Sequence, residues 1–327
     1  MNIEQIQRLR MYNLFLTRSC PDIVTLSREL LGLHSWFQRN VRYSALIRGA
    51  DISGWKTRLV KTWLYRGTLH GVDPDELPLL LSPHADAASW YGDHFGRELI
   101  ERVSEDVVRA MEDGVYSRAE LRRIFADTYD SETLKHIFSS WGGIFVPLAR
   151  QGRVAFRSMT SRDFDLIAIG DIPSPSDALS QLLPRYFETY GPATVADAAW
   201  FFGLAPELIN QAYLSTLQSF ALDGGIYYHA PAPSNLPDTP EVALLSGFDP
   251  LIVSYAWRGA VMPPEYRCRV VLKSGICMPA VAVRGRIAGL WSIQKREPTV
   301  EFFESQPKRI RSAALEQIAR IVSAPEN

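Results

Sequence analysis

The segment Gly191-Pro-Ala-Thr-Val-Ala-Asp-Ala198 repeats in outline an earlier one, Gly114-Val-Tyr-Ser-Arg-Ala-Glu-Leu121. Both follow the pattern Gly-x-x-(Ser/Thr)-x-Ala-(Asp/Glu)-apolar. The hydroxyl of Ser117 or Thr194 is placed to cap the amino end of a helix, and the acidic residue three positions later completes a capping box. Each segment therefore predicts a helix that begins directly after a turn, and together they predict an internal repeat.

Helical runs flank both copies of this repeat. An amphipathic run precedes each copy, at residues 99–111 and 182–190, and a second helical run comes after each, at 132–141 and 206–217. A helix, a turn and two further helices form the skeleton of a helix-turn-helix module. The same order also occurs in unrelated helical hairpins, so the segment after each trio of helices has to decide the fold.

A stretch with a glycine-bearing turn comes after each trio. Residues 144–157 carry Gln151-Gly-Arg153 at the expected tip, and residues 220–228 carry Asp223-Gly-Gly225. Both stretches predict β-hairpins. A helix-turn-helix followed by a hairpin is a winged helix, so the repeat predicts two winged helices.

The amino-terminal segment fits the same plan. Helices are expected near residues 4–16, 22–31 and 35–48, and a hairpin at 58–72 would turn near Gly67. The sequence therefore predicts a third winged helix that precedes the other two.

From about residue 243 the sequence changes to short β-rich runs separated by Gly and Pro. We expect strands at 268–272, 278–283 and 287–293, and a closing helix at about 308–322. The predicted fold class is α+β, with three tandem winged-helix domains and a small C-terminal β-rich, barrel-like element. The predicted domains are winged helices at 1–92, 93–172 and 173–242 and the β-rich domain at 243–327.

Charge is unevenly distributed along the 327 residues, although the net charge is only −1. Residues 1–72 hold eleven Lys and Arg against four Asp and Glu, residues 251–327 hold twelve against six, and residues 73–250 therefore carry −14. Such opposed blocks favour a polyanionic partner such as nucleic acid at both ends of the chain. The alternative is chance segregation of charge on solvated surfaces.

Composition excludes several other classes of protein. A hydrophobic fraction of 46% and a charged fraction of 22% are typical of a folded globular chain. Three cysteines without a CxxC pair, and an amino end without an apolar leader, predict a reducing compartment, the cytoplasm. No apolar run reaches the roughly 20 residues that a membrane span needs. The histidines lack metal-ligand spacing and the nucleotide-binding glycine motifs are absent, so neither a metal nor a cofactor is expected.

Four motifs, one of which is the repeat segment that begins at Gly191, occur in one order along nearly the whole chain. They are Arg58-Leu-Val-Lys-Thr-Trp-Leu-Tyr-Arg-Gly-Thr-Leu-His70, Gly191-Pro-Ala-Thr-Val-Ala-Asp197, Leu245-Ser-Gly-Phe-Asp-Pro250 and Arg284-Gly-Arg-Ile-Ala-Gly-Leu-Trp291. Each resembles a motif of the AlkZ-like (YcaQ-like) family of bacterial alkylpurine DNA glycosylases. The resemblance implies three tandem winged helices that present a basic concave surface to duplex DNA. It also implies removal of N7-alkylated or bulky-adducted purines, in some members from interstrand crosslinks.

The catalytic signature of that family is Gln-apolar-Gln or Gln-apolar-Asp, directly after a Gly-Leu pair. Here the Gly-Leu pair ends at residue 33, and the next residues are His34, Ser35 and Trp36, with Gln38 two residues further on. The resemblance implies that His34 replaces the first glutamine and Trp36 the second polar residue, and that Gln38 substitutes only if the register shifts. A neutral histidine can orient or deprotonate a water, whereas tryptophan can stack on a base. Alternatively, His34 and Trp36 pack in the core where a helix starts.

The predicted DNA contacts come from the basic ends of the chain. They are Arg58, Lys61, Arg66, Arg258, Arg267, Arg269, Lys273, Arg284 and Arg286. Arg66, directly before Gly67, suits a wing tip that reaches a phosphate, or else a structural turn. Asp249 suits a turn cap better than an acidic group in a cleft.

Two functions remain open at this point. The first is a monofunctional DNA glycosylase that uses His34, and the second is a winged-helix protein that binds DNA or regulates transcription without catalysis. The sequence contains no heptad run or other dimerisation helix, so we expect a monomer bound to duplex DNA.

Overall fold

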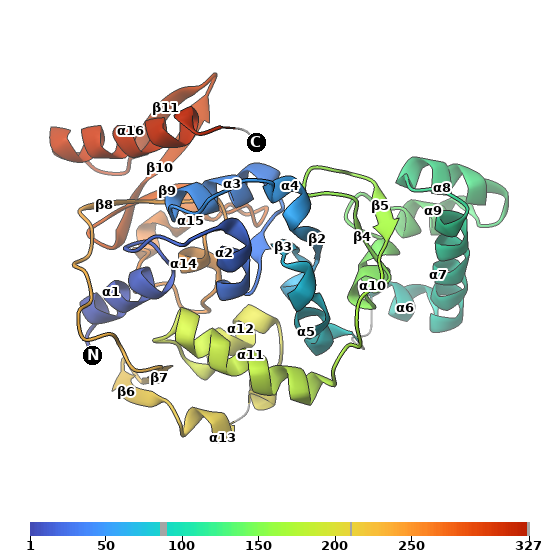
Figure 1. Cartoon of the computed structure of the whole chain (residues 1–327), viewed down its shortest axis with the longest axis horizontal. Coiled ribbons are helices and arrows are strands. Elements are labelled where there is room, and N and C mark those ends of the chain that lie inside the picture. The colour runs from blue at the N-terminus through green and yellow to red at the C-terminus, as the bar shows by residue number, and fades with distance from the viewer. Residues whose placement is uncertain (86–89, 210, 326–327) are drawn as a thin grey trace. The chain divides into compact units, whose positions relative to one another are not determined.

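The computed structural model describes residues 1–85, 90–209 and 211–325 (Figure 1). The chain divides into two units, one formed by Met1–Trp55 together with Leu179–Asn327 and the other by Lys56–Ala178. The first is built from two separated stretches of sequence and is called the discontinuous unit below. The second is called the continuous unit. The predicted boundaries of the four domains stay a prediction.

Two helices of the discontinuous unit, α1 (Ile3–Asn13) and α12 (Val195–Phe202), begin at capping boxes. Asn2 forms a capping box, and Thr194 forms the predicted one with Asp197. Each such cap stabilises a helix by about 1 kcal/mol. The helices of this unit up to residue 214 are α1 (Ile3–Asn13), α2 (Ile23–Glu29), α3 (Gln38–Ile47), α11 (Pro175–Tyr190), which begins in the continuous unit, α12 (Val195–Phe202) and α13 (Gln211–Leu214). The three helices expected before residue 50 are confirmed.

The helical run predicted at 206–217 is only partly right. It contains a 3-10 turn, η5 (Pro206–Leu208), and the short helix α13. Ile209 takes an extended backbone with ψ 113°, so the turn that Pro206 begins does not continue as a helix. The next strands, β6 (Gln218–Leu222) and β7 (Gly225–His229), form the predicted hairpin. Asp223 and Gly224 close it with φ values of 48° and 79°, which suit a two-residue hairpin turn.

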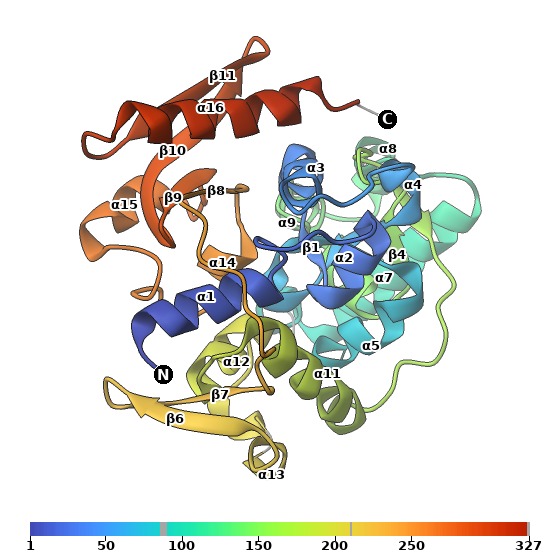
Figure 2. The ribbon, with the colours of Figure 1, turned by 60° about the vertical axis from the view of Figure 1, so that its left-hand side comes forward.

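The last part of the discontinuous unit is a four-stranded antiparallel sheet, in the order β11-β10-β9-β8. Its strands are β8 (Val242–Leu245), β9 (Ala280–Val283), β10 (Arg286–Gln294) and β11 (Glu297–Phe302). The strands predicted at 278–283 and 287–293 and the helix predicted at 308–322 are confirmed, the last as α16 (Lys308–Ser323). Figure 2 shows α16 lying along this sheet. Its apolar face, which includes Ile310 and Ile318, packs with Trp291 in one hydrophobic cluster.

The strand predicted at 268–272 is wrong. Residues Pro264–Tyr266 form a 3-10 turn, η6, that runs directly into the short helix α15 (Arg267–Val270). The Val271 N–H donates to the Arg267 carbonyl at 2.8 Å, which closes one helical turn, and Val271 makes an isolated antiparallel bridge to Cys277 in place of the predicted strand. The pattern misled because Val270 is buried while Arg267 and Arg269 are exposed, and that spacing fits a strand as well as one helical turn.

The continuous unit holds an antiparallel sheet in which β3, β2, β4 and β5 lie in that order. The strands are β2 (Val60–Trp63), β3 (Leu69–Val72), β4 (Val154–Phe156) and β5 (Phe164–Leu166). The hairpin predicted at 58–72 is confirmed by the pairing of β2 with β3. The helices and turns are α4 (Trp55–Arg58), which begins in the discontinuous unit, η1 (Tyr65–Gly67), η2 (Pro74–Glu76), α5 (Leu77–Leu81), η3 (Ser82–His84), α6 (Trp90–Phe95), α7 (Arg97–Glu112), α8 (Arg118–Ile124), η4 (Phe125–Asp127), α9 (Ser131–Ile137) and α10 (Phe145–Arg150). Ser117 caps α8 as predicted.

The hairpin predicted at 144–157 is wrong. Its first half is the helix α10, and the hairpin is formed later, by β4 and β5. Gly152, expected at a hairpin tip, has φ 69° and ends α10, because its N–H donates to Ala149 and the next N–H donates to Leu148. A left-handed glycine serves a hairpin turn and a helix end equally well, so the residue alone could not distinguish them.

No helix among the residues that the structure describes is long and apolar enough to cross a membrane.

Candidate functional site

The predicted catalytic residues lie where α2 gives way to α3. Leu31 and Gly32 have φ values of 52° and 106°, which end α2 and direct the chain into β1 (Leu33–His34). His34 and Trp36 are half-buried, whereas Ser35 between them is fully buried. Both predicted residues therefore keep part of their surface accessible, in contrast to Ser35.

Gln38 is the first residue of α3 and is exposed. The helix has Phe37 at its N-cap position, with no side-chain hydrogen bond to the first turn. The three candidates thus lie on one short segment, and Gln38 is the most exposed of them.

An aromatic ring from a distant part of the sequence holds His34. The imidazole stacks on the ring of Phe248 with centroids 4.0 Å apart and an angle of 5° between the planes. Phe37 joins this group, with its centroid 6.4 Å from that of Phe248. Sequence reasoning did not single out Phe248, although it lies inside one of the four quoted motifs.

The residue after Phe248 belongs to a buried ion pair. Asp249 is fully buried and accepts hydrogen bonds from the Arg48 guanidinium through both carboxylate oxygens, at 3.0 and 3.1 Å. It also accepts from the N–H of Leu251, which confirms the predicted cap, here of α14 (Pro250–Val253). No sequence pattern indicated Arg48 as its partner.

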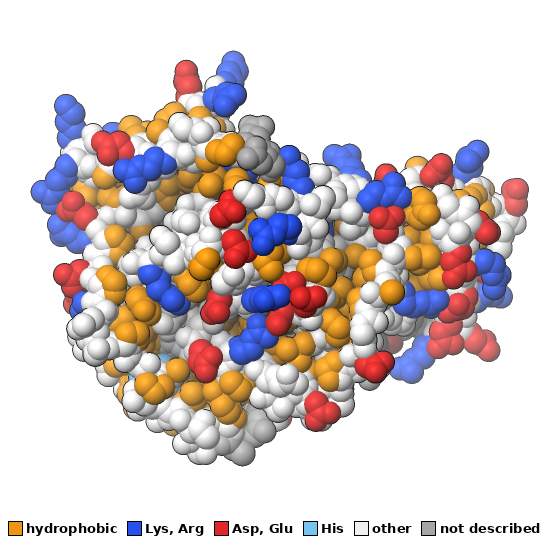
Figure 3. Space-filling view, viewed as in Figure 1, with side chains coloured by type: hydrophobic (Ala, Val, Ile, Leu, Met, Phe, Trp, Pro, Cys, Tyr) orange, Lys and Arg blue, Asp and Glu red, His pale blue; other side chains and the backbone are white. Residues whose placement is uncertain are grey.

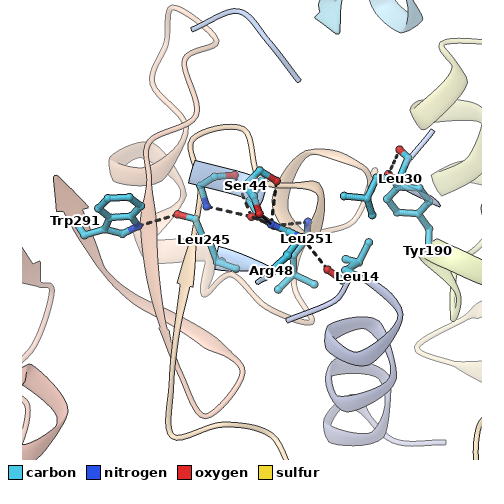
Figure 4. A network of polar contacts seen from close by, with 10 residues as sticks. Leu14, Leu30, Ser44, Arg48, Tyr190, Leu245, Leu251 and Trp291 are labelled. Carbon is cyan, nitrogen blue, oxygen red and sulfur yellow. Dashed lines mark hydrogen bonds and ion pairs between the residues drawn. The ribbon is translucent and has the colours of Figure 1, made fainter. Parts of the chain in front are cut away.

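Arg48 uses the rest of its guanidinium to join three segments. Its Nε donates to the Leu14 carbonyl at 2.8 Å, and its Nη1 donates to the Ser44 hydroxyl at 3.0 Å (Figure 4). Because both charges are 0% exposed, each depends on the other and on these carbonyl and hydroxyl oxygens for its stability. The backbone on either side of Asp249 is therefore held firmly in place.

A second buried cation supports the same unit. Arg10 is fully buried, donates to the Pro192 carbonyl at 2.7 and 2.9 Å, and lies with its guanidinium carbon 3.6 Å from the centre of the Tyr255 ring. Asp197, the capping-box residue, lies 3.9 Å from Arg10 and accepts the Ala256 N–H at 2.9 Å. Burial raises the pKa of the Tyr255 phenol, so this ring is neutral. Asp197 therefore caps α12 and also links this helix to Arg10 and to the backbone at Ala256.

Five of the six predicted DNA-binding residues of the discontinuous unit are exposed. Arg267, Lys273 and Arg286 are exposed. Arg269 and Arg284 are exposed as well but form ion pairs with Glu301 and Glu241. Figure 3 shows Lys and Arg side chains spread over α16 and β11, mixed with a smaller number of acidic ones.

Arg258 differs from these residues. It is half-buried, donates from Nε to the Ile252 carbonyl at 2.9 Å and lies over the Trp200 ring at 5.4 Å. Burial lowers the pKa of its guanidinium. These contacts favour a structural role for Arg258 over the predicted contact with DNA.

The remaining predicted contacts belong to the continuous unit. Arg58 is exposed at the end of α4, and Arg66 has φ 53° in the turn next to Gly67. Lys61 is half-buried with its ammonium 4.3 Å from the centre of the Phe156 ring, and burial lowers its pKa. His70, the last residue of the motif that begins at Arg58, is buried and lies 3.0 Å from the Thr68 carbonyl through Nδ1, and burial lowers its pKa to about 4.

Within residues 1–85, 90–209 and 211–325, no group of three or more His, Cys, Asp or Glu side chains is arranged to hold a metal ion.

Comparison with known proteins identifies the family of the chain. It matches the family described as DNA glycosylase AlkZ-like over residues 55–323. The protein belongs to this family. The matched range begins after His34, so membership of the AlkZ-like family does not depend on the departure from the catalytic signature.

Individual relatives agree with this assignment to the AlkZ-like family. The chain is 25% identical over 351 residues to the interstrand DNA cross-link repair glycosylase of Streptomyces sahachiroi, and the alignment covers 98% of this chain and 87% of the relative. The solved structure of the DNA glycosylase AlkZ from the same organism matches with a TM-score of 0.82 at 24% identity. That match covers 98% of this chain and 97% of the other, which shows that the two chains share one fold.

Proposed function

We propose that the protein is a DNA glycosylase that removes N7-alkylated purines from duplex DNA, with His34 as the residue that directs the attacking water. The observation that carries the proposal is the placement of His34. Its imidazole is half-buried and stacked on Phe248, and the resemblance of its segment to the AlkZ-like signature implies that it replaces the first catalytic glutamine. Membership of that family supports DNA as the substrate.

The chemistry requires little from the protein because the substrate is already activated. An N7-alkylpurine is cationic, so when the C1′–N9 bond breaks, the bonding electron pair moves to N9 and neutralises the base. Water adds to C1′ of the sugar, and the proton that it loses passes to a ring nitrogen of His34 and then to solvent. The products are a free purine and an abasic site, and no cofactor takes part.

Trp36 and Gln38 have different parts in this proposal. The indole of Trp36 cannot accept a proton, so it would stack on a base or fill the gap that the extruded nucleotide leaves. Gln38, exposed at the start of α3, is available to a phosphate or sugar of the bound strand. The site therefore has one polar group for the water where the family has two, and we expect slow excision.

The exposed cations would bind the phosphates of the duplex. Arg267, Lys273 and Arg286 are the best placed, since they are exposed and on one unit. Arg269 and Arg284 would have to exchange a carboxylate partner for a phosphate, which makes their contribution smaller. Arg58 and Arg66 would supply contacts from the continuous unit.

The scaffold for these contacts would be the three predicted winged helices, each a group of helices that ends in a hairpin. The pairs β2–β3, β4–β5 and β6–β7 supply a hairpin for each of them. Such a protein would act on duplex DNA as a monomer, in the cytoplasm and at the nucleoid.

Release of 7-methylguanine from a methylated duplex tests the proposal. The wild-type protein should release the base, and His34→Ala should lose this activity while its affinity for the duplex stays nearly the same, since one side chain adds little to a footprint of several phosphates. His94→Ala is the matched control, because His94 is exposed on α6 and should be dispensable. Wild-type protein that binds the duplex but releases no base would overturn the proposal in favour of a DNA-binding protein without catalysis.

A further inference from the structure

Phe248 occupies a backbone conformation that phenylalanine rarely adopts. Its φ is 55°, at the third position of a four-residue turn that the Asp249 N–H closes on the Ser246 carbonyl at 3.2 Å. Glycine and asparagine are the usual residues at such a position. Phe15 and Leu31 also have a positive φ, but both are core residues whose burial offsets the strain. Phe248 is only half-buried, so packing alone does not explain why a phenylalanine stands there.

Three neighbouring interactions keep this turn in its strained form. The Phe248 N–H donates to the Cys277 carbonyl at 3.2 Å, and the buried pair of Arg48 and Asp249 fixes the next residue. On the other side Gly247 lies against Asn40, so closely that a Cβ on Gly247 would come within 2.7 Å of the Asn40 amide oxygen. A strained residue held in this way by its surroundings indicates a functional constraint.

The ring that this turn presents lies parallel to the imidazole of His34, 4.0 Å away. The protons and lone pairs of a histidine lie in the plane of its ring, so a group that fixes the plane also fixes the directions in which the two nitrogens bind. One face of His34 is covered by Phe248. A water that donates to His34 must therefore approach along the edge of the ring.

We propose that Phe248 is a positioning residue for His34, held in a strained turn so that the imidazole edge is aimed at the attacking water. This inference rests on the function proposed above. It assigns the ring of Phe248 to the positioning of His34, and the buried pair of Arg48 and Asp249 to the support of the turn that carries this ring. In this role Phe248 acts through His34 and not on the substrate.

Three substitutions at this position separate positioning from packing. Phe248→Tyr keeps the ring, Phe248→Leu keeps most of the volume without it, and Phe248→Gly relieves the backbone while removing the ring. With a methylated duplex under single-turnover conditions, Phe248→Tyr should excise 7-methylguanine at nearly the wild-type rate. Phe248→Leu and Phe248→Gly should be slower by about 10- to 100-fold, the cost of a misplaced catalytic group. The affinity for the duplex should not change.

A readout of His34 itself completes the test. The order parameter of its ring carbon, measured by NMR relaxation, should fall in Phe248→Leu and stay at the wild-type value in Phe248→Tyr. Phe248→Gly should melt close to the wild-type temperature, because relief of the backbone offsets the loss of a half-buried ring. Active wild-type protein together with unchanged excision in Phe248→Leu would overturn this inference alone. Inactive wild-type protein would overturn it together with the proposed function.

Discussion

The buried pair of Arg48 and Asp249 predicts a large effect from the loss of one charge. Asp249→Asn keeps the shape of the side chain and its capacity to cap α14, but it leaves the Arg48 guanidinium, which is 0% exposed, without an anion. Removing one partner of a buried pair costs about 3–5 kcal/mol. In domains of about 150–250 residues, the size class of the discontinuous unit that holds this pair, each kcal/mol lowers Tm by about 2–4 °C, so we expect a fall of about 6–20 °C.

The assay is thermal unfolding followed by circular dichroism, with a matched exposed pair as the control. Arg269 and Glu301 also form an ion pair, but their side chains are 43% and 69% exposed. Glu301→Gln should therefore cost less than about 1 kcal/mol. The double variant Arg48→Met/Asp249→Leu should recover part of the stability, since it leaves no unpaired charge. The reasoning is refuted if Asp249→Asn melts no lower than Glu301→Gln.

Three further predictions concern DNA binding, catalysis and pH. Affinity for duplex DNA should fall steeply with salt concentration, and neutralising Arg267, Arg269 and Lys273 together should weaken binding to all sequences alike and flatten this salt dependence. Binding titrations at two ionic strengths measure both effects. An affinity that does not depend on salt would contradict them. Trp36→Gln should raise the excision rate by up to about 100-fold, because it restores a second hydrogen-bonding group for the water. A lower Tm with no gain in rate would show that the indole is needed for packing. His70, whose folded pKa is about 4, stays neutral in the folded state while the unfolded state takes up a proton near pH 6.5. The free energy of unfolding should therefore fall by about 3 kcal/mol as pH drops from about 6.5 to about 4. Denaturant titrations should show this fall in the wild-type protein and not in His70→Gln.

Features determined by neighbouring residues were predictable from the sequence. The caps at Ser117 and Thr194 and the hairpin turn at Asp223-Gly224 depend on contacts within four residues, so their patterns carried enough information. The errors arose where one local pattern suits two structures. Gly152 ends a helix instead of turning a hairpin, and residues 267–270 form a helical turn instead of a strand.

The candidate site was predictable only in part, because its support comes from far along the chain. The resemblance to a known signature pointed to His34, but nothing near residue 34 indicates that Phe248 stacks on it. The same holds for Arg48, which meets Asp249 across 201 positions of sequence. A single sequence gives both residues of such a pair but does not show that they are in contact in the fold.

That separation also determines when the protein can fold as the ribosome makes it. Arg10 and Arg48 leave the ribosome long before Asp197 and Asp249, and at about 5–20 residues per second the 201 positions between Arg48 and Asp249 take roughly 10–40 s to synthesise. During this interval the amino-terminal helices carry two cations whose burial would be unfavourable, so they must wait in a solvated, incomplete state. Residues 56–178 form one continuous stretch and meet no such delay. We expect residues 56–178 to fold first during synthesis. The amino-terminal helices should pack only after the second half of the chain has left the ribosome.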